Sequence, residues 1–180
     1  MGNVIVFLAD GFEEIEGLTV VDLLRRAGIA VTTVSIQEGK EVMGAHQIPV
    51  LADCVLEQAD FETADMLVLP GGMPGTLHLG ECKVVTEKCV EFFKAGKEVA
   101  AICAAPSVLG DLGILQGKRC TCYPGFEERL KGIVSTNPVE SDGNVTTSRG
   151  MGTAIPFALK LIEKLISSQK AEEIKNSIIY

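Results

Sequence analysis

The sequence predicts an α/β protein in which a mostly parallel β-sheet carries helices on both faces. Short apolar segments recur without polar residues at alternate positions, as in strands that are buried on both faces. Amphipathic segments of helical length separate them, and glycine or proline ends most elements. Such alternation is typical of parallel sheets, because each crossover helix returns the chain to the same edge. The 180 residues, 47% of them hydrophobic, suffice for a single domain over residues 1–180 with one substantial core.

The first three elements form a β-α-β unit. Residues 3–9 are a continuous apolar run that Asp10 and Gly11 end, which predicts a buried strand. An amphipathic helix follows and stops at Gly28, and residues 30–36 return as the second strand. The apolar positions expected on this helix are Ile15, Leu18, Val21 and Leu24.

The later elements continue the alternation. Residues 42–56, with Gly44 and Pro49, indicate a small hairpin and a loop. The expected strands are residues 66–69, 98–102 and 145–148. The expected helices are residues 83–95, 104–112 and 153–166, with a helical turn at 126–130 inside the irregular segment 118–137. The apolar face of the last helix is expected at Ile155, Ala158, Leu159, Ile162 and Ile166.

The charge excludes two classes of partner. A formal net charge of −8, with no run of Lys and Arg, makes the surface repel phosphate backbones and anionic lipid. Residues 4–9 are far shorter than a membrane span of about 20 residues, and no basic region precedes them. We therefore expect no nucleic-acid or membrane partner and a cytoplasmic location.

The six cysteines do not predict disulfides or a metal site. A reducing compartment disfavours disulfides, and the sequence holds no C-x-x-C pair and no nearby histidine to complete four metal ligands. We expect no metal, and most of these thiols as small buried hydrophobic groups.

Cys103 is the candidate nucleophile. It comes directly after the strand 98–102 and directly before a helix, so its thiol is expected on a tight elbow over the sheet edge, as in hydrolases. A helix N-terminus favours the thiolate, so the sequence predicts a lowered pKa for this thiol. The competing interpretation is a buried structural cysteine.

Glu16 is the candidate acid/base partner. Asp10, Glu13 and Glu14 precede it after the first strand, and such a group is ordinarily a solvated helix start. The position of Glu16 on the helix allows it to face the sheet edge, where burial would raise its pKa and let it hold a proton.

Backbone amides near Cys103 are expected to bind substrate. Gly71 and Gly72 follow the strand 66–69, and glycines allow the backbone to approach a ligand closely. With the amide of Ala104 they could form an oxyanion pocket, although a plain strand end is an equally good interpretation.

Three further features carry less weight. Gly150 and Gly152 resemble the start of a dinucleotide fingerprint, but Ile155 stands at the third glycine position. His46 lies in the expected hairpin and His78 in a loop, so the sequence contains no local Cys-His dyad. A surface or capping role is favoured for His78.

Four motifs in register resemble the DJ-1/ThiJ/PfpI superfamily, specifically its DJ-1 branch. The likeness runs over essentially the whole chain. The motifs are Ala9-Asp-Gly-Phe-Glu-Glu-Ile-Glu16, Leu69-Pro-Gly-Gly72, Ala101-Ile-Cys-Ala-Ala-Pro106 and Thr147-Ser-Arg-Gly-Met-Gly-Thr153.

The resemblance implies a flavodoxin-like three-layer sandwich, a homodimer, and a Cys103 thiolate that accepts a hydrogen bond from protonated Glu16. It also implies a cofactor-independent enzyme acting on small reactive dicarbonyls such as methylglyoxal, by a glyoxalase III or deglycase activity. The alternative is an oxidative-stress sensor or chaperone in which the cysteine becomes a sulfinic acid. Many relatives have a histidine where this chain has Tyr123, which disfavours a protease.

Overall fold

The computed structural model of the protein describes residues 2–180 and is built around a seven-stranded sheet. The strand order is β10-β11-β7-β6-β1-β2-β5. The strands are β1 (Asn3–Leu8), β2 (Ala30–Ser35), β5 (Cys54–Val55), β6 (Met66–Leu69), β7 (Glu98–Ile102), β10 (Val139–Asp142) and β11 (Val145–Ser148). Every neighbouring pair is parallel except β10 and β11, so the mostly parallel α/β sheet is confirmed.

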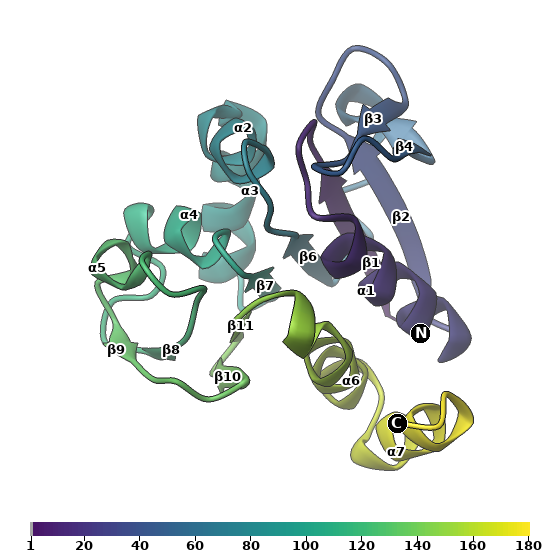
Figure 1. The fold of residues 1–180 in the computed structure, drawn as a ribbon, viewed down its shortest axis with the longest axis vertical. Helices are drawn as coiled ribbons and strands as arrows, with labels where there is room; N and C mark the ends of the chain where they lie inside the picture. The colour runs from purple at the N-terminus through teal and green to yellow at the C-terminus, as the bar shows by residue number, and fades with distance from the viewer. Residues whose placement is uncertain (1) are drawn as a thin grey trace.

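Helices cover both faces of this sheet (Figure 1). Helices α1 (Glu14–Arg26), α6 (Ala154–Leu165) and α7 (Ser168–Ser177) contribute to one core. Helices α2 (Gly75–Glu81), α3 (Lys83–Lys94), α4 (Pro106–Asp111) and α5 (Glu127–Leu130) contribute to the other. The result is the three-layer sandwich that the resemblance implied.

Strand β1 explains why the apolar runs lack alternation. Val4 and Val6 pack into the core with α1 and α6, while Ile5 and Phe7 pack into the core with α3. All four side chains are buried, because each face of the sheet meets a helix layer.

Short elements complete the fold outside the main sheet. The hairpin expected within residues 42–56 is present as β3 (Glu41–Met43) and β4 (Pro49–Leu51), which are antiparallel. Strands β8 (Arg119–Cys120) and β9 (Ile133–Val134) pair in the segment expected to be irregular. Two 3₁₀ turns lie at Leu56–Gln58 and Met151–Thr153.

The structure corrects the expected apolar faces of two helices. On α1, Ile15 is 51% and Leu18 37% exposed, because the face toward the sheet is formed by Glu16, Gly17 and the apolar residues from Val20 onward. At the end of α6, Ile166 is exposed and follows the helix instead of belonging to it.

Strand β10 and helices α2 and α7 were not predicted, because their sequences are mostly polar or short. Strand β10 is the edge strand Val-Glu-Ser-Asp, and α7 buries only Ala171 and Ile174. Helix α2 contains two glycines in seven residues, which disfavour helix. Among residues 2–180, no helix combines the length and apolarity needed to cross a membrane.

Candidate active site

The candidate site lies where the order of the strands reverses. From β1 the chain first adds β2 on one side and later β6 and β7 on the other, and ligands bind at such switch points in α/β sheets. The amide of Glu13 donates to the carbonyl of Gly71 over 2.9 Å, and the amide of Gly75 donates to the carbonyl of Gly11 over 3.2 Å. The loops after β1 and β6 are thereby joined beside the end of β7.

Cys103 occupies a strained turn at the end of β7. Its φ is 67°, in the left-handed region that costs a non-glycine residue about 1–3 kcal/mol. Its amide donates to the carbonyl of Ser148 over 3.0 Å, and its carbonyl accepts from the amide of Tyr123 over 2.8 Å. These bonds hold the elbow expected from the sequence. Helix α4 begins only at Pro106, so the expected helix start directly after Cys103 lies three residues later.

The thiol opens into a cavity of about 730 Å³. The cavity is lined by Glu13, Glu16, His46, Gly72, Met73, Cys103, Ala104, Tyr123, Pro124, Phe126, Arg149, Gly150, Met151, Gly152 and Thr153. Cys103 is the one cysteine in this lining, and Cys89, Cys120 and Cys122 are buried in the core on the opposite face of the sheet from α1. A small molecule in this cavity would therefore meet a single thiol.

Glu16 is the buried carboxyl group beside that thiol. It lies in the first turn of α1 and is 1% exposed. Its Oε2 accepts a 3.0 Å hydrogen bond from the amide of Gly71, and its carboxylate also accepts from the Cys103 thiol. Burial raises the pKa of Glu16 to about 7, with the charge of Glu13 acting in the same direction and the two hydrogen bonds opposing it.

The structure contradicts the lowered pKa predicted for Cys103. Burial, together with the negative charge of Glu16 and the hydrogen bond to it, raises the pKa of this thiol to about 12. The amides of Gly72 and Ala104 act in the opposite direction but do not outweigh these effects. The N-terminus of α4 lies three residues from Cys103, and desolvation of the thiol is the dominant effect.

Cys103 and Glu16 consequently behave as a coupled pair. With Glu16 ionised, the negative carboxylate keeps the proton on sulfur. Transfer of that proton to Glu16 removes the repulsion, so the thiolate is accessible only while Glu16 holds a proton. The pair can therefore expose a nucleophilic sulfur at the moment a substrate is attacked, with Glu16 acting as the base.

Gly71, Gly72 and Ala104 have different positions around this pair. A Cβ on Gly71 would lie 2.5 Å from Cβ of Cys103 and 2.6 Å from Oε2 of Glu16, so only glycine fits there. The amide of Gly71 is engaged by Glu16. The amides of Gly72 and Ala104 lie against the sulfur, which narrows the expected oxyanion pocket to these two groups.

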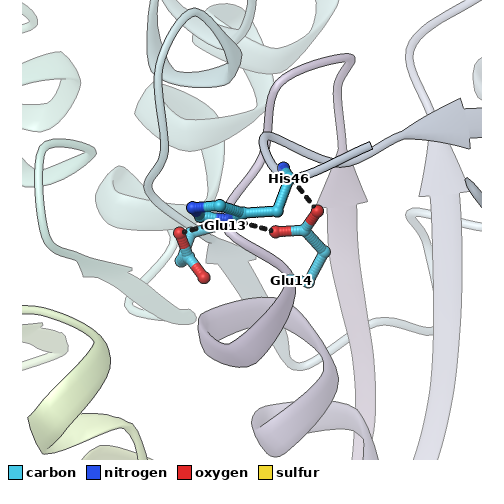
Figure 2. Close-up of side chains that lie close together, drawn as sticks. All are labelled: Glu13, Glu14 and His46. Atoms are coloured by element: carbon cyan, nitrogen blue, oxygen red, sulfur yellow. Dashed lines mark hydrogen bonds and ion pairs between the residues drawn. The ribbon is translucent and has the colours of Figure 1, made fainter. Parts of the chain in front are cut away.

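Glu13, Glu14 and His46 form a second polar cluster (Figure 2). Glu13 and His46 line the cavity, and Glu14 is buried behind them. Nδ1 of His46 lies 2.9 Å from Oε2 of Glu14 and 3.5 Å from Oε2 of Glu13. The His46 amide donates to Oε1 of Glu14 over 2.7 Å. Within residues 2–180 this is the one group of three His, Cys, Asp or Glu side chains with donor atoms mutually within 4.8 Å. His46 thus contacts both carboxyl groups, and protonated His46 forms an ion pair with each of them.

The structure places His78, Gly150 and Gly152, whose roles the sequence did not decide. Nδ1 of His78 lies 2.9 Å from the carbonyl of Asp10 and thus contacts the loop after β1. Gly150 and Gly152 line the cavity, as does Tyr123, whose ring is 3.2 Å from the position of a Cβ on Gly150. His46 and Arg149 were not predicted as cavity residues. His46 lies in the hairpin β3–β4, outside the main sheet, whereas Arg149 directly follows the parallel strand β11 and could have been found by the same rule as Cys103.

The family model described as the DJ-1/PfpI family matches residues 2–164 of the chain. The chain belongs to the DJ-1/PfpI family. A curated relative, protein dj-1beta of Drosophila melanogaster, is 38% identical over 180 residues and covers 98% of this chain and 96% of its own. The crystal structure of Drosophila melanogaster DJ-1beta superposes on this chain with a TM-score of 0.95. The match covers 99% of this chain and 97% of the Drosophila chain.

Two further relatives carry informative names. The glutathione-independent glyoxalase DJR-1.2 of Caenorhabditis elegans is 36% identical over 168 residues, covering 90% of this chain and 87% of its own. A structure named Toxoplasma gondii DJ-1, oxidized, is 35% identical with a TM-score of 0.96 and covers 100% and 99% of the two chains. The resemblance found in the sequence is thereby confirmed at the level of family and fold.

Proposed function

We propose that this protein converts small reactive dicarbonyls such as methylglyoxal into hydroxy acids without a cofactor, using Cys103 as the nucleophile. The observation that carries the proposal is the pairing of the cavity thiol with a buried carboxyl group whose pKa is about 7. Such a group can both accept and return a proton near neutral pH. The name of the Caenorhabditis elegans relative supports the same chemistry.

The first step forms a hemithioacetal. Sulfur attacks the aldehyde carbon while the thiol proton passes to Glu16, and the carbonyl electron pair moves to oxygen. The amides of Gly72 and Ala104 are suited to stabilise that oxygen, because they already point at the sulfur. Glu16 then returns the proton to the oxygen and is again a carboxylate.

The second step moves hydrogen between neighbouring carbons. Glu16 takes the proton from the former aldehyde carbon, an enediolate forms with its negative charge on the former ketone oxygen, and Glu16 returns the proton to the former ketone carbon. The hydroxyl proton of the carbon bonded to sulfur passes to the former ketone oxygen, which leaves the thioester carbonyl. The product is a lactate thioester of Cys103, and water hydrolyses it to lactate and the free thiol. Overall, one methylglyoxal and one water give one lactic acid, so no oxidant or reductant is needed.

Lactate production from methylglyoxal without glutathione tests this proposal. We expect turnover by the wild type and none by Cys103→Ser. Cys89→Ser is the matched control, because Cys89 is buried away from the cavity, and it should keep the activity. Equal rates for wild type and Cys103→Ser would overturn the proposal. A protein adduct of methylglyoxal as substrate would identify the deglycase form of the same chemistry.

The second candidate function is a cysteine-based oxidative sensor or redox-regulated chaperone. The observation that favours it is that Cys103 opens into the cavity, while Cys89, Cys120 and Cys122 are buried. Oxidation by peroxide needs an accessible sulfur and its thiolate, which Cys103 can supply by passing its proton to Glu16. The oxygens of a sulfinate could then accept from the amides of Gly72 and Ala104. Peroxide titration followed by mass spectrometry should oxidise Cys103 before Cys54 and Cys89. Equal oxidation rates would rule the sensor out.

We also propose that the protein is a homodimer. Apolar side chains are exposed on α1 and on the neighbouring hairpin β3–β4, where Leu51 is 74% exposed. The amide of Ala45 donates to the carbonyl of Phe12 over 2.8 Å, so the hairpin is attached beside the start of α1. Exposed apolar groups on adjacent elements are typical of a surface that a partner covers.

A further inference from the structure

We infer that His46 is a second proton carrier of the Cys103 cavity, acting on the ketone end of a bound dicarbonyl. The inference rests on the proposed function and deepens it. It begins from the observation that the ring of His46 lines the same cavity as Cys103 and Glu16 although it comes from the hairpin β3–β4, not from the main sheet. Nothing in the two proposed steps uses this ring.

The backbone fixes His46 at the rim. The amide of Gly11 donates to the carbonyl of Met43 over 2.7 Å, and the amide of Met43 donates to Oδ1 of Asp10 over 2.8 Å. These bonds, and that from Ala45 to Phe12, attach the turn that carries His46 to the loop before α1. The ring therefore belongs to the same rigid loop cluster as the buried carboxyl group.

The side chain of Glu14 fixes the orientation of the ring. Glu14 is buried and accepts from both the amide and Nδ1 of His46. Gly44 makes room for it, since a Cβ there would lie 2.2 Å from Oε1 of Glu14. Figure 2 shows the two carboxyl groups converging on Nδ1, so Nε2 is the ring nitrogen available to a molecule in the cavity.

The carboxylates also set the charge of the ring. The hydrogen bond that His46 donates to Glu14, together with the charges of Glu13 and Glu14, raises the pKa of His46 above its ordinary value. The shift favours the imidazolium form, in which Nε2 carries a proton to donate. The other titratable or charged side chains of the cavity are Glu16, Cys103, Tyr123 and Arg149.

The hydrogen shift of the proposed reaction needs a donor of this kind. When Glu16 takes the proton from the carbon bonded to sulfur, Nε2 of His46 donates its proton to the ketone oxygen, and a neutral enediol forms. When Glu16 returns its proton to the former ketone carbon, Nε2 takes the proton from the neighbouring hydroxyl, whose oxygen becomes the thioester carbonyl. Both residues end in their starting protonation states, so protons and electrons balance.

The test compares His46→Gln with His78→Gln. His78 contacts the loop after β1 but does not line the cavity, so it is a matched histidine control. We expect His46→Gln to lower the turnover of methylglyoxal to lactate about a hundredfold, as loss of a general acid commonly does, and His78→Gln to leave it unchanged. Alkylation of Cys103 by iodoacetamide should proceed at the wild-type rate in both, which shows that the site is folded.

Two further readouts separate a proton carrier from a structural residue. The wild-type turnover should fall on the alkaline side as His46 loses its proton, and this limb should be absent from His46→Gln. The variant should also accumulate the covalent methylglyoxal adduct on Cys103, because adduct formation precedes the step that His46 serves. Glu14→Gln should shift the alkaline limb to lower pH, since the carboxylate that raises the pKa is gone.

The outcomes distinguish this inference from the proposed function. Wild-type turnover by His46→Gln, or an unchanged alkaline limb, would overturn the inference alone. Slow alkylation of Cys103 in His46→Gln would also overturn it, by showing a structural role. Absence of lactate production by the wild type would overturn both.

Discussion

The amide of Gly71 donates a 3.0 Å hydrogen bond to Oε2 of Glu16, and the Cα of Gly71 packs directly against Cys103. One residue after β6 thus supports both members of the coupled pair. Because the bond favours the charged carboxylate, it keeps the pKa of Glu16 from rising as far as burial alone would take it. Position 71 therefore influences how readily Glu16 accepts the thiol proton.

Gly71→Ala should damage the site more than the fold. The added Cβ would approach Cβ of Cys103 and Oε2 of Glu16 within 2.6 Å, and relief of such contacts costs about 1–3 kcal/mol. We expect urea denaturation to show a free energy of unfolding lower by this amount, and we expect alkylation of Cys103 to be much slower. Gly39→Ala is the control, since its Cβ would meet nothing within 4 Å, and it should change stability by less than about 0.5 kcal/mol. Wild-type alkylation by Gly71→Ala would contradict the described packing.

Glu16→Gln should stabilise the protein at neutral pH. Because folding raises the pKa of Glu16 from 4.5 to about 7, the folded protein holds this proton over a range where the unfolded chain has lost it. The resulting stability is complete below pH 4.5 and is lost as the pH rises to about 7. A shift of this size corresponds to about 3 kcal/mol at most. Glutamine does not ionise and should avoid that loss.

The measurement is urea denaturation of wild type and Glu16→Gln across this pH range. The gain should be largest above pH 7 and should disappear toward pH 4.5. Glu57→Gln, at an exposed position in a 3₁₀ turn, should show no such pH-dependent gain. A Glu16→Gln variant that is less stable than wild type at alkaline pH would refute the assigned direction.

The alkylation rate of Cys103 should increase as the pH rises through about 7. A thiol with a pKa of about 12 is protonated there, so the increase reports ionisation of Glu16, which then accepts the thiol proton. In Glu16→Gln this increase should be absent. The rise in alkylation rate that accompanies direct ionisation of the thiol should also begin at lower pH in this variant than in wild type, because the carboxylate charge no longer raises the pKa of the thiol. A wild-type rate that is flat through pH 7 would exclude Glu16 as the base.

Sequence reasoning located the sheet edge and the two central residues because both follow buried strands. The rule that ligands bind beyond the carboxyl ends of parallel strands selects the loops after β1, β6 and β7. Backbone hydrogen bonds join the first two loops, and Glu16 accepts a hydrogen bond from Cys103 in the third. Glu16 could be assigned to the inner face of α1 although the apolar face was expected at Ile15 and Leu18. That error arose because the buried face begins with Glu14, Glu16 and Gly17, none of which has an apolar side chain.

The electrostatics of the site and the second cluster could not be predicted in the same way. The pKa of Cys103 depends on burial and on the charge of Glu16, neither of which the sequence measures. His46 reaches the cavity through the pairing of Phe12 with Gly44, a contact between residues far apart in the chain. The one trace of this contact in the sequence is Gly44 itself, because the side chain of Glu14 leaves no room for a Cβ at that position.

Leu51→Glu should convert the proposed homodimer to a monomer. Leu51 is the most exposed apolar side chain of the hairpin β3–β4, and a stable interface buries about 800 Å² per partner, from which a charge is largely excluded. Sedimentation velocity should give twice the 19.1 kDa chain mass for the wild type and the single chain mass for the variant. Ile133→Glu, at an exposed apolar residue of β9, is the matched control and should remain dimeric. A dimeric Leu51→Glu would place the interface elsewhere, and a monomeric wild type would overturn the proposed dimer itself.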